Sequence, residues 1–216
     1  GYVSSLNENV INGDIGEIIR ISEALHEKKI ANIADEICKD EEVRIVLIAG
    51  PSSSGKTTFA HRLLTQLKVN GKKPISISLD DYFVNRVDTP KDEDGEYDFE
   101  SIHAIDIDTF NKDLVKLLEG EEVELPIYNF LTGEREYRGD VVKVDKKHPI
   151  IIEGIHGLNE KLTPSIPKRN KFKIYVSALT QLNIDAHNRI HTTDTRLIRR
   201  MVRDKNFRGN DAFRTL

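Results

Sequence analysis

The residues best suited to chemistry form one glycine-rich stretch, Gly50-Pro-Ser-Ser-Ser-Gly-Lys-Thr57, called here the phosphate loop. It matches the pattern G-x-x-x-x-G-K-[ST], in which loop amides and a helix N-terminus surround a phosphate. Gly50 and Gly55 permit the backbone angles and the close approach that such a loop needs. We expect Lys56 to reach the β- and γ-phosphates of ATP and the Thr57 hydroxyl to bind Mg²⁺. The predicted nucleotide-binding residues are Gly50, Ser52, Ser53, Ser54, Gly55, Lys56, Thr57 and Thr58.

The segments on either side of this loop predict how it is held. Residues 43–49 are mostly β-branched and apolar, which is typical of a strand buried on both faces. Residues 58–67 place their apolar side chains on one helical stripe. A strand, a glycine loop and a helix in this order are the context that the motif requires, and they argue against a glycine-rich turn that binds nothing.

Acidic residues follow two further predicted strands. Asp80 and Asp81 come directly after residues 75–79, and Glu153 lies near the end of residues 149–155. The carboxyl ends of parallel strands lie beside the phosphate loop, where a carboxylate can accept a proton or help to hold Mg²⁺. We predict that Asp80 is the base and that Thr57, Asp80 and Glu153 form the metal site. The alternative is that an Asp after a strand forms a turn or caps a helix.

Four arginines near the C-terminus have helical spacing. Arg196, Arg199, Arg200 and Arg203 fall on one face of a predicted helix, where their positive charges repel each other unless anions meet them. A lid that closes arginines over transferring phosphates would supply those anions, and it makes Arg196 and Arg200 candidate catalytic residues beside Lys56 and Asp80. A solvated basic face, paired with acidic loops, is the alternative.

The middle of the chain offers candidate acceptor-binding residues. Residues 85–102, called here the acidic loop, form a connection long enough to suggest a functional or disordered segment. Tyr128 and Phe130 could stack on a planar or sugar substrate, or equally form a small satellite core. Arg138-Gly-Asp140 predicts the turn of a hairpin.

The N-terminal residues predict one amphipathic helix over residues 14–38, with Asp14 as its N-cap and Glu17 completing a capping box. The helix either packs on the sheet, which is the favoured interpretation, or docks a preceding domain. We therefore divide the chain into an N-terminal helical linker segment, residues 1–42, and a P-loop kinase domain, residues 43–216. The chain starts without Met and stops inside a helix-like region, so we expect a piece of a longer protein whose flanking parts, the C-terminus included, are missing.

Composition narrows the class of protein. The net charge of −4 and the pI of about 6.0 provide no basic field for nucleic acid. A single cysteine, Cys38, fits a reducing cytosol, and we predict a cytoplasmic location. No stretch approaches the roughly 20 apolar residues that span a bilayer, so no membrane partner is expected. A homo-oligomer is left open.

Together the motifs resemble the uridine kinase and phosphoribulokinase family of P-loop kinases. The resemblance covers about residues 43 to 210. It is carried by the phosphate loop, Ser78-Leu-Asp-Asp-Tyr-Phe83, Tyr97-Asp98, Leu125-Pro-Ile-Tyr-Asn-Phe130, Ile152-Glu-Gly-Ile155 and Thr195-Arg-Leu-Ile-Arg-Arg200. Bacterial uridine kinase-like nucleoside kinases are the most similar members, and some carry a preceding domain related to threonyl-tRNA synthetase.

The resemblance implies residue roles. Asp80 matches a base that activates a ribose 5′-hydroxyl, and Glu153 and Thr57 match magnesium-side groups. The residues expected to bind the acceptor are Asp81, Tyr82, Asp98, Tyr128, Phe130 and the lid residue Arg196. Gly133 stands where pyrimidine nucleoside kinases often place a base-contacting His, which puts uridine specificity in doubt.

We predict an α/β P-loop NTPase fold, with a mostly parallel sheet flanked by helices and a small hairpin or lid appendage. The predicted activity is transfer of the γ-phosphoryl of Mg·ATP to a hydroxyl of a small molecule, a nucleoside first. A sugar, a sugar phosphate or a polyol is the alternative acceptor. The alternative class is a nucleotide-gated binding module without transfer.

Overall fold

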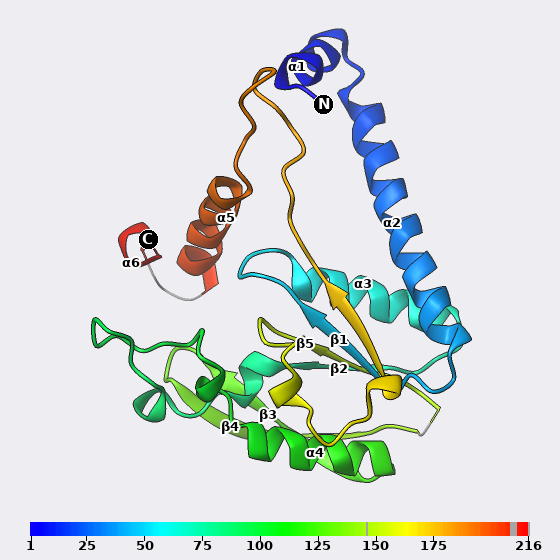
Figure 1. Cartoon of the computed structure of the whole chain (residues 1–216), viewed down its shortest axis with the longest axis vertical. Helices are drawn as coiled ribbons and strands as arrows, with labels where there is room; N and C mark the ends of the chain where they lie inside the picture. Colours follow the sequence, from blue (N-terminus) through cyan, green and yellow to red (C-terminus); the bar gives the residue numbers. More distant parts are fainter. Residues whose placement is uncertain (146, 208–210, 216) are drawn as a thin grey trace.

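A four-stranded parallel sheet forms the centre of the computed structural model, which describes residues 1–145, 147–207 and 211–215. The strands lie in the order β2-β5-β1-β6 (Figure 1). Parallel neighbours need crossover connections, and helices supply several of them. This arrangement confirms the predicted α/β fold class. The strands are β1 (Ile45–Ala49), β2 (Ile75–Ser78), β5 (Ile150–Glu153) and β6 (Lys171–Tyr175).

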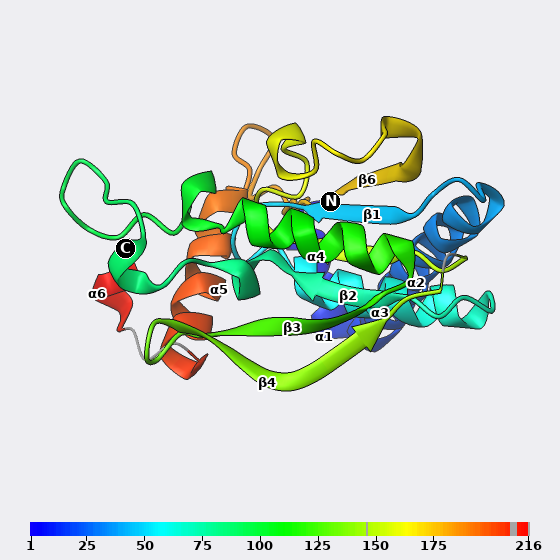
Figure 2. The same ribbon diagram turned by 90° about the horizontal axis from the view of Figure 1, so that it is seen from below.

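Successive side chains of β1 point to opposite faces of the sheet and divide the interior into two cores. On one face, Val46 packs in a cluster with apolar residues of helix α3 (Lys56–Val69). On the other face, Ile45 packs in a cluster with helix α4 (Ile107–Glu119) and with the hairpin of strands β3 (Glu122–Asn129) and β4 (Glu134–Lys143). Figure 2 shows α4 and this hairpin along the sheet. Both faces of the sheet are therefore covered, which explains the continuous apolar run of β1.

Two helices precede the sheet, where the sequence predicted one. Helix α1 (Val3–Asn12) ends at Gly13, and helix α2 (Ile15–Lys39) follows directly. The predicted capping box is wrong, because Asp14 has helical backbone angles and makes no side-chain cap. An N-cap residue needs an extended backbone to turn its side chain onto the next amides, and the tight passage from α1 to α2 does not give Asp14 that conformation.

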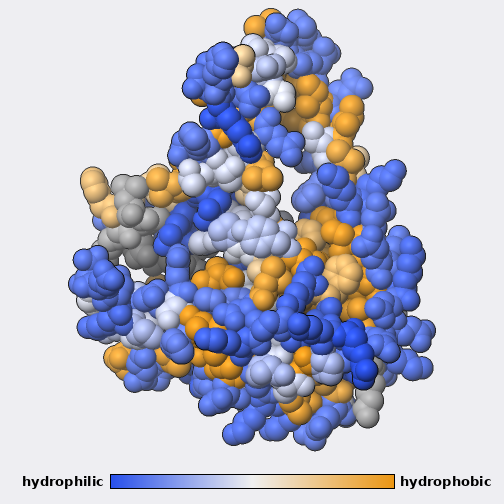
Figure 3. Space-filling view, viewed as in Figure 1, coloured by the Kyte–Doolittle hydropathy of each residue, from blue (hydrophilic) through white to orange (hydrophobic). Residues whose placement is uncertain are grey.

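The C-terminal half of α2 packs on the rest of the molecule. Ile30, Ala34 and Ile37 are buried against the α3 core, whereas Ile21 and Leu25 are 60% and 53% exposed. Figure 3 shows apolar atoms on the surface along the outer part of α2. The favoured interpretation therefore fits the inner half of this helix. For the outer half, docking of another domain stays a prediction.

The hairpin exists, but it turns at a different place from the one predicted. Strand β3 (Glu122–Asn129) pairs antiparallel with β4 (Glu134–Lys143), so the turn spans residues 130–133. Asn129 shapes this turn, because its side-chain oxygen accepts two backbone amides of the turn at 3.0 and 3.3 Å. Short polar side chains that bind the backbone just ahead of them are common turn formers.

The predicted turn at Arg138-Gly-Asp140 is wrong, because these residues lie inside β4. Gly139 has a φ of 81°, the left-handed angle that also occurs at a hairpin turn. Its amide instead donates to the Glu124 carboxylate at 2.7 Å, near the point where the β3-β4 register shifts. A left-handed glycine marks a bulge as readily as a turn, and the sequence pattern does not separate the two.

A long connection, residues 176–191, leads from β6 to helix α5 (Thr192–Phe207) and folds back against the N-terminus (Figure 1). The amide of Val3 donates to the carbonyl of Asn183 at 2.9 Å, and the amide of Asn183 donates to the carbonyl of Gly1 at 2.9 Å. The first residues of the chain are therefore tied to the segment that introduces α5.

Helix α6 (Ala212–Thr215) is the last element. Short 3-10 helices cover Leu79–Tyr82, Arg86–Asp88, Ile102–Ala104, Glu160–Leu162 and Lys168–Asn170. Across the described ranges, no helix combines the length and the apolar character needed to cross a membrane.

Leu63→Ala tests the core on the α3 face. Leu63 is 0% exposed, so its truncation should lower the free energy of unfolding by about 2–5 kcal/mol through lost burial and a residual cavity. Val69→Ala, in the same helix but 74% exposed, is the matched control and should change stability by no more than about 0.5 kcal/mol. Urea denaturation of both variants checks this, and equal effects would contradict the assigned packing.

Candidate functional site

The phosphate loop joins β1 to α3, and its two glycines are needed for different reasons. Gly55 has a φ of 96°, in the left-handed region that favours glycine. Gly50 is required by close approach, because a Cβ there would lie 2.3 Å from the carbonyl oxygen of Val176. Ser53 also has a positive φ, 59°, a conformation that costs free energy for a residue with a side chain. Such strain often occurs where a backbone is shaped around a ligand.

Polar groups in the phosphate loop are left unpaired by the protein. The Ser53 and Ser54 hydroxyls are buried and have no hydrogen-bond partner among the described residues. Lys56 folds over the loop, where its Nζ donates to the carbonyl of Pro51 at 3.3 Å, and burial lowers its pKa. Buried donors without acceptors are costly. Together with the amides of a helix N-terminus, they fit the oxygens of a phosphate chain.

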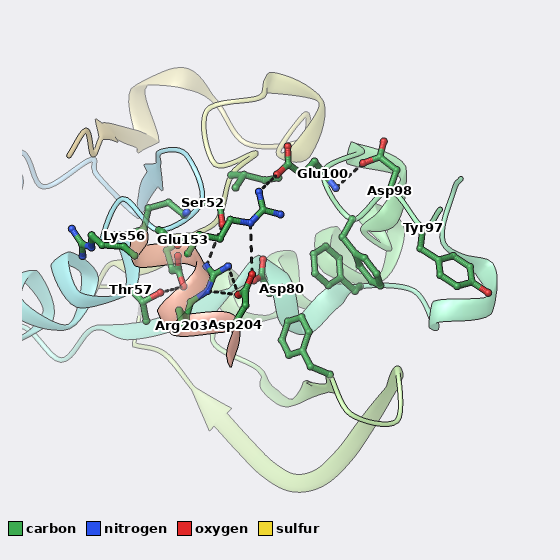
Figure 4. A pocket seen from close by; sticks show the side chains of 18 of the residues that line it. Ser52, Lys56, Thr57, Asp80, Tyr97, Asp98, Glu100, Glu153, Arg203 and Asp204 are labelled. Carbon is green, nitrogen blue, oxygen red and sulfur yellow. Dashed lines mark hydrogen bonds and ion pairs between the residues drawn. The ribbon is translucent and has the colours of Figure 1, made fainter. Parts of the chain in front are cut away.

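The strand register brings the predicted metal-site residues together. Glu153 at the end of β5 lies opposite Ser78 of β2 and Ile48 of β1. Its Oε1 accepts from the Thr57 hydroxyl at 2.9 Å and from the Ser78 hydroxyl at 3.4 Å, and burial raises its pKa. Asp80 lines the same cavity as Thr57 and Glu153 (Figure 4).

This donor set fits Mg²⁺, which prefers oxygen ligands and usually retains waters and substrate phosphates in its shell. Across the described residues, no group of three or more His, Cys, Asp or Glu could hold a metal ion. A cation at Thr57 and Glu153 would therefore depend on phosphate oxygens and water for the rest of its shell.

A cavity of about 1090 Å³ extends from the phosphate loop (Figure 4). Three walls surround it: the phosphate loop with the strand ends, the arginine face of α5, and the acidic loop with neighbouring aromatic rings. The last two walls contribute the residues Phe83, Arg86, Asp92, Glu96, Tyr97, Asp98, Phe99, Glu100, Phe130, Arg199, Arg200, Arg203 and Asp204. The cavity is large enough for a nucleotide and part of a second molecule.

Helix α5 places its arginines against the phosphate loop. Arg203 donates from Nη1 to the Ser52 hydroxyl at 3.2 Å, and Arg196 donates from Nε to the Ser52 carbonyl at 3.2 Å. Arg200 lies across the cavity, with Nη1 3.7 Å from Glu100 of the acidic loop. The predicted basic face therefore meets the phosphate loop, although it also makes the acidic-loop pairing that the alternative interpretation named. Arg196 itself lines a separate cavity of about 290 Å³.

Of the residues predicted to bind the acceptor, Asp98 and Phe130 line the large cavity. Asp81, Tyr82, Tyr128 and Arg196 do not. The 3-10 turn Leu79–Tyr82 directs Asp80 to the cavity, while Asp81 accepts the amide of Tyr128 at 3.2 Å and burial raises its pKa. The Tyr82 hydroxyl donates to Asp113 at 3.1 Å inside the core.

Aromatic residues line the end of the cavity formed by the acidic loop. Tyr128 is 3% exposed and packs edge-to-face on Phe130 and Phe83, with ring centroids 5.1 and 5.5 Å apart. Both alternatives for the aromatic pair therefore hold in part: Tyr128 belongs to a core, and Phe130 reaches the cavity. The Asp98 carboxylate also shapes the acidic loop, since it accepts the amides of Glu100 and Ser101 at 2.9 and 3.1 Å.

Several cavity residues were not selected from the sequence. Arg86 and Glu100 come from the acidic loop, whose lack of periodicity carries no information about which side chains face inward. Asp204 had a usable signal, because it lies four residues after Arg200 on the helix and next to Arg203. Such spacing indicates an ion pair within the basic face.

Glu153→Gln tests the burial of the Glu153 carboxylate. Its folded-state pKa is raised above the unfolded value, so its stabilising contribution is present at low pH and lost as pH rises through the folded pKa. Glutamine does not titrate. We therefore expect the variant to gain stability relative to the parent chain as pH rises above about 4.5, the ordinary pKa of a glutamate.

Urea midpoints of both proteins across this pH range measure the effect. Glu119→Gln, an exposed position near the end of α4, is the matched control and should run parallel to the parent chain. Parallel curves for Glu153→Gln as well would contradict a desolvated carboxylate at position 153.

Comparison with known proteins gives independent information about the family of this chain. Residues 45–214 match the sequence profile described as the Phosphoribulokinase / Uridine kinase family. A uridine kinase from Ligilactobacillus salivarius is 31% identical over 165 residues, which cover 76% of this chain and 68% of that protein. The inorganic pyrophosphatase TTM2 of Arabidopsis thaliana is 37% identical over 132 residues, covering 61% of this chain. The match spans 18% of the length of the Arabidopsis protein.

Solved structures agree on the fold. A structure of a possible uridine kinase from Bacillus stearothermophilus superposes with a TM-score of 0.51 at 22% identity. The match covers 68% of this chain and 80% of that chain. At this identity the similarity concerns the fold alone.

Proposed function

The chain belongs to the phosphoribulokinase and uridine kinase family, and we propose on that premise that it transfers the γ-phosphoryl group of Mg·ATP to a hydroxyl of a small molecule. The observation that carries this proposal is a single cavity lined by phosphate-loop residues, by Asp80 and by Arg199, Arg200 and Arg203 of α5. A nucleoside is the proposed acceptor, since relatives named uridine kinases align over most of the chain and aromatic rings line the acceptor end.

Each wall of the cavity has a role in this proposal. Lys56 and the loop hydroxyls bind the phosphate chain, while Thr57 and Glu153 hold Mg²⁺, which neutralises phosphate charge. Asp80 accepts the proton of the acceptor hydroxyl as its oxygen attacks the γ-phosphorus and the bond to ADP breaks. Arg200 adds positive charge beside the transferring group. Arg196 secures the phosphate loop through the Ser52 carbonyl.

The acceptor is held at the other end of the cavity, with Asp98 and Phe130 as its proposed contacts. Gly133 contributes no side chain there. Its φ is 78°, and a Cβ at this position would lie 2.8 Å from the side chain of Arg86. Arg86 lines the cavity and donates to the Phe130 carbonyl at 2.6 Å, so Arg86 is the proposed polar contact beside Gly133.

We further propose that residues 43–216 form the kinase domain, that residues 1–42 link it to a preceding domain, and that the protein works in the cytoplasm.

Release of ADP with Mg·ATP tests the activity against a panel of nucleosides, sugars, sugar phosphates and polyols. We expect one nucleoside to raise ADP release above the level seen with ATP alone. Lys56→Ala provides the blank, because it removes the phosphate-binding ammonium group. Stimulation by another acceptor class would correct the acceptor. If no compound in the panel raises ADP release and the protein still binds ATP, a nucleotide-gated module is favoured instead.

Asp80→Asn tests the proposed base. An amide cannot accept the hydroxyl proton, so turnover should fall by roughly 10²-fold or more while ATP affinity stays within a few-fold. Asp108→Asn, an exposed position in the first turn of α4, controls for the loss of one negative charge. Unchanged turnover in Asp80→Asn would remove this residue from the mechanism.

A further inference from the structure

The arginine face of α5 contains one acidic residue whose burial needs an explanation. Asp204 lines the large cavity and is 4% exposed, although it lies within a helix that carries four arginines. A carboxylate is rarely this buried unless charged partners compensate for its lost hydration. Its surroundings therefore indicate what it does.

Both oxygens of Asp204 face guanidinium groups. Oδ1 accepts from Nε of Arg203 at 2.8 Å and lies 2.7 Å from Nη2 of the same residue. Oδ2 lies 3.7 Å from Nε of Arg200. One carboxylate is thus shared by two arginines that would otherwise repel each other.

These two arginines contact opposite walls of the cavity. Arg203 donates to the Ser52 hydroxyl of the phosphate loop at 3.2 Å, and Arg200 lies 3.7 Å from Glu100 of the acidic loop. Figure 4 shows Asp204 and Arg203 in the cavity that Asp80 also lines, with Arg203 joined to Ser52. The position of Asp204 therefore bears on both the nucleotide end and the acceptor end of the cavity.

The pairing leaves donor capacity on both arginines. Nε of Arg200 and Nη2 of Arg203 are buried without a hydrogen-bond acceptor among the described residues, although each lies within ion-pair distance of Asp204. These two nitrogens are buried against Asp204, so their position depends on the carboxylate. A guanidinium group has five N–H donors, and phosphate oxygens can accept those of Arg200 and Arg203 that do not face Asp204.

We propose that Asp204 is a positioning residue that aligns the guanidinium groups of Arg200 and Arg203 over the bound phosphates. It acts through the arginines and does not itself touch the reacting atoms. The inference rests on the proposed function only in assuming that a nucleoside triphosphate occupies the phosphate loop. It requires neither a particular acceptor nor transfer.

Asp204→Asn tests the proposal, because alignment of the arginines and simple loss of a negative charge predict opposite changes in the affinity for Mg·ATP. If the arginines kept their positions, removal of a negative charge near the phosphates would tighten binding of Mg·ATP. Loss of alignment should instead weaken binding of a fluorescent ATP analogue with Mg²⁺ by about 10-fold, which corresponds to 1.4 kcal/mol. Asp194→Asn, exposed in the first turn of the same helix, is the matched control and should leave the affinity unchanged. Equal or tighter binding by Asp204→Asn would overturn the proposal.

A double-mutant cycle with Arg203→Gln shows whether Asp204 acts through its partner. The double variant should bind the analogue about as well as Arg203→Gln alone, because the carboxylate then has less to align. If the losses of affinity in the two single variants multiply in the double variant, the two residues act independently, and the proposal is overturned. If Asp204→Asn fails to fold, the substitution is made in an Arg200→Gln/Arg203→Gln background, where no unpaired guanidinium remains. It should then leave the affinity unchanged, and a further loss of affinity would contradict alignment of these arginines.

The same variants separate this inference from the proposed function. With a responsive acceptor, Asp204→Asn should also lower kcat, and Asp204→Glu should recover part of it. Without any responsive acceptor, the transfer activity fails, but the binding cycle still decides the role of Asp204.

Discussion

The candidate site depends on the register of three parallel strands. Backbone hydrogen bonds place Glu153 of β5 between Ile48 of β1 and Ser78 of β2. The phosphate loop after β1, the carboxylate of β5 and Asp80 beyond β2 therefore lie at one edge of the sheet. A slip of one residue in β5 would turn Glu153 to the other face and remove its contact with Thr57. The chemistry of the site is thus determined by main-chain pairing as much as by the side chains.

Opposite charges confined in one cavity dominate the energetics around this edge. Burial raises the pKa of Glu153 and lowers that of Lys56, so each group is held in a medium that penalises its charge. Each also lowers the penalty of the other, because their opposite charges attract. Helix α5 brings arginines to the same place and compensates for their repulsion with Asp204. Such a network is complete only when anions occupy the phosphate loop, so ligand binding and the order of α5 are expected to be linked.

The sequence predicts the parts of the site whose determinants are local. The strand, loop and helix over residues 43–67 form one continuous segment, so pattern and periodicity were sufficient. Asp80 and Glu153 could be predicted because parallel strand ends converge whatever the rest of the fold does. The burial of Tyr82 depends on a 3-10 turn and on a distant partner, Asp113, which no local pattern records. The acidic loop has no periodic pattern that indicates which side chains face inward. The place of Glu100 in the cavity was therefore found only from the structure.

The two backbone hydrogen bonds that Asn183 makes with Val3 and Gly1 have a consequence for the movement of the chain. They make α1 and residues 176–191 a brace between the start of the chain and the helix that carries the arginines. A movement of α5 that displaces residue 183 must carry the first residues of the chain with it or break these two bonds. Hydrogen exchange of the Val3 and Asn183 amides would then report such a movement.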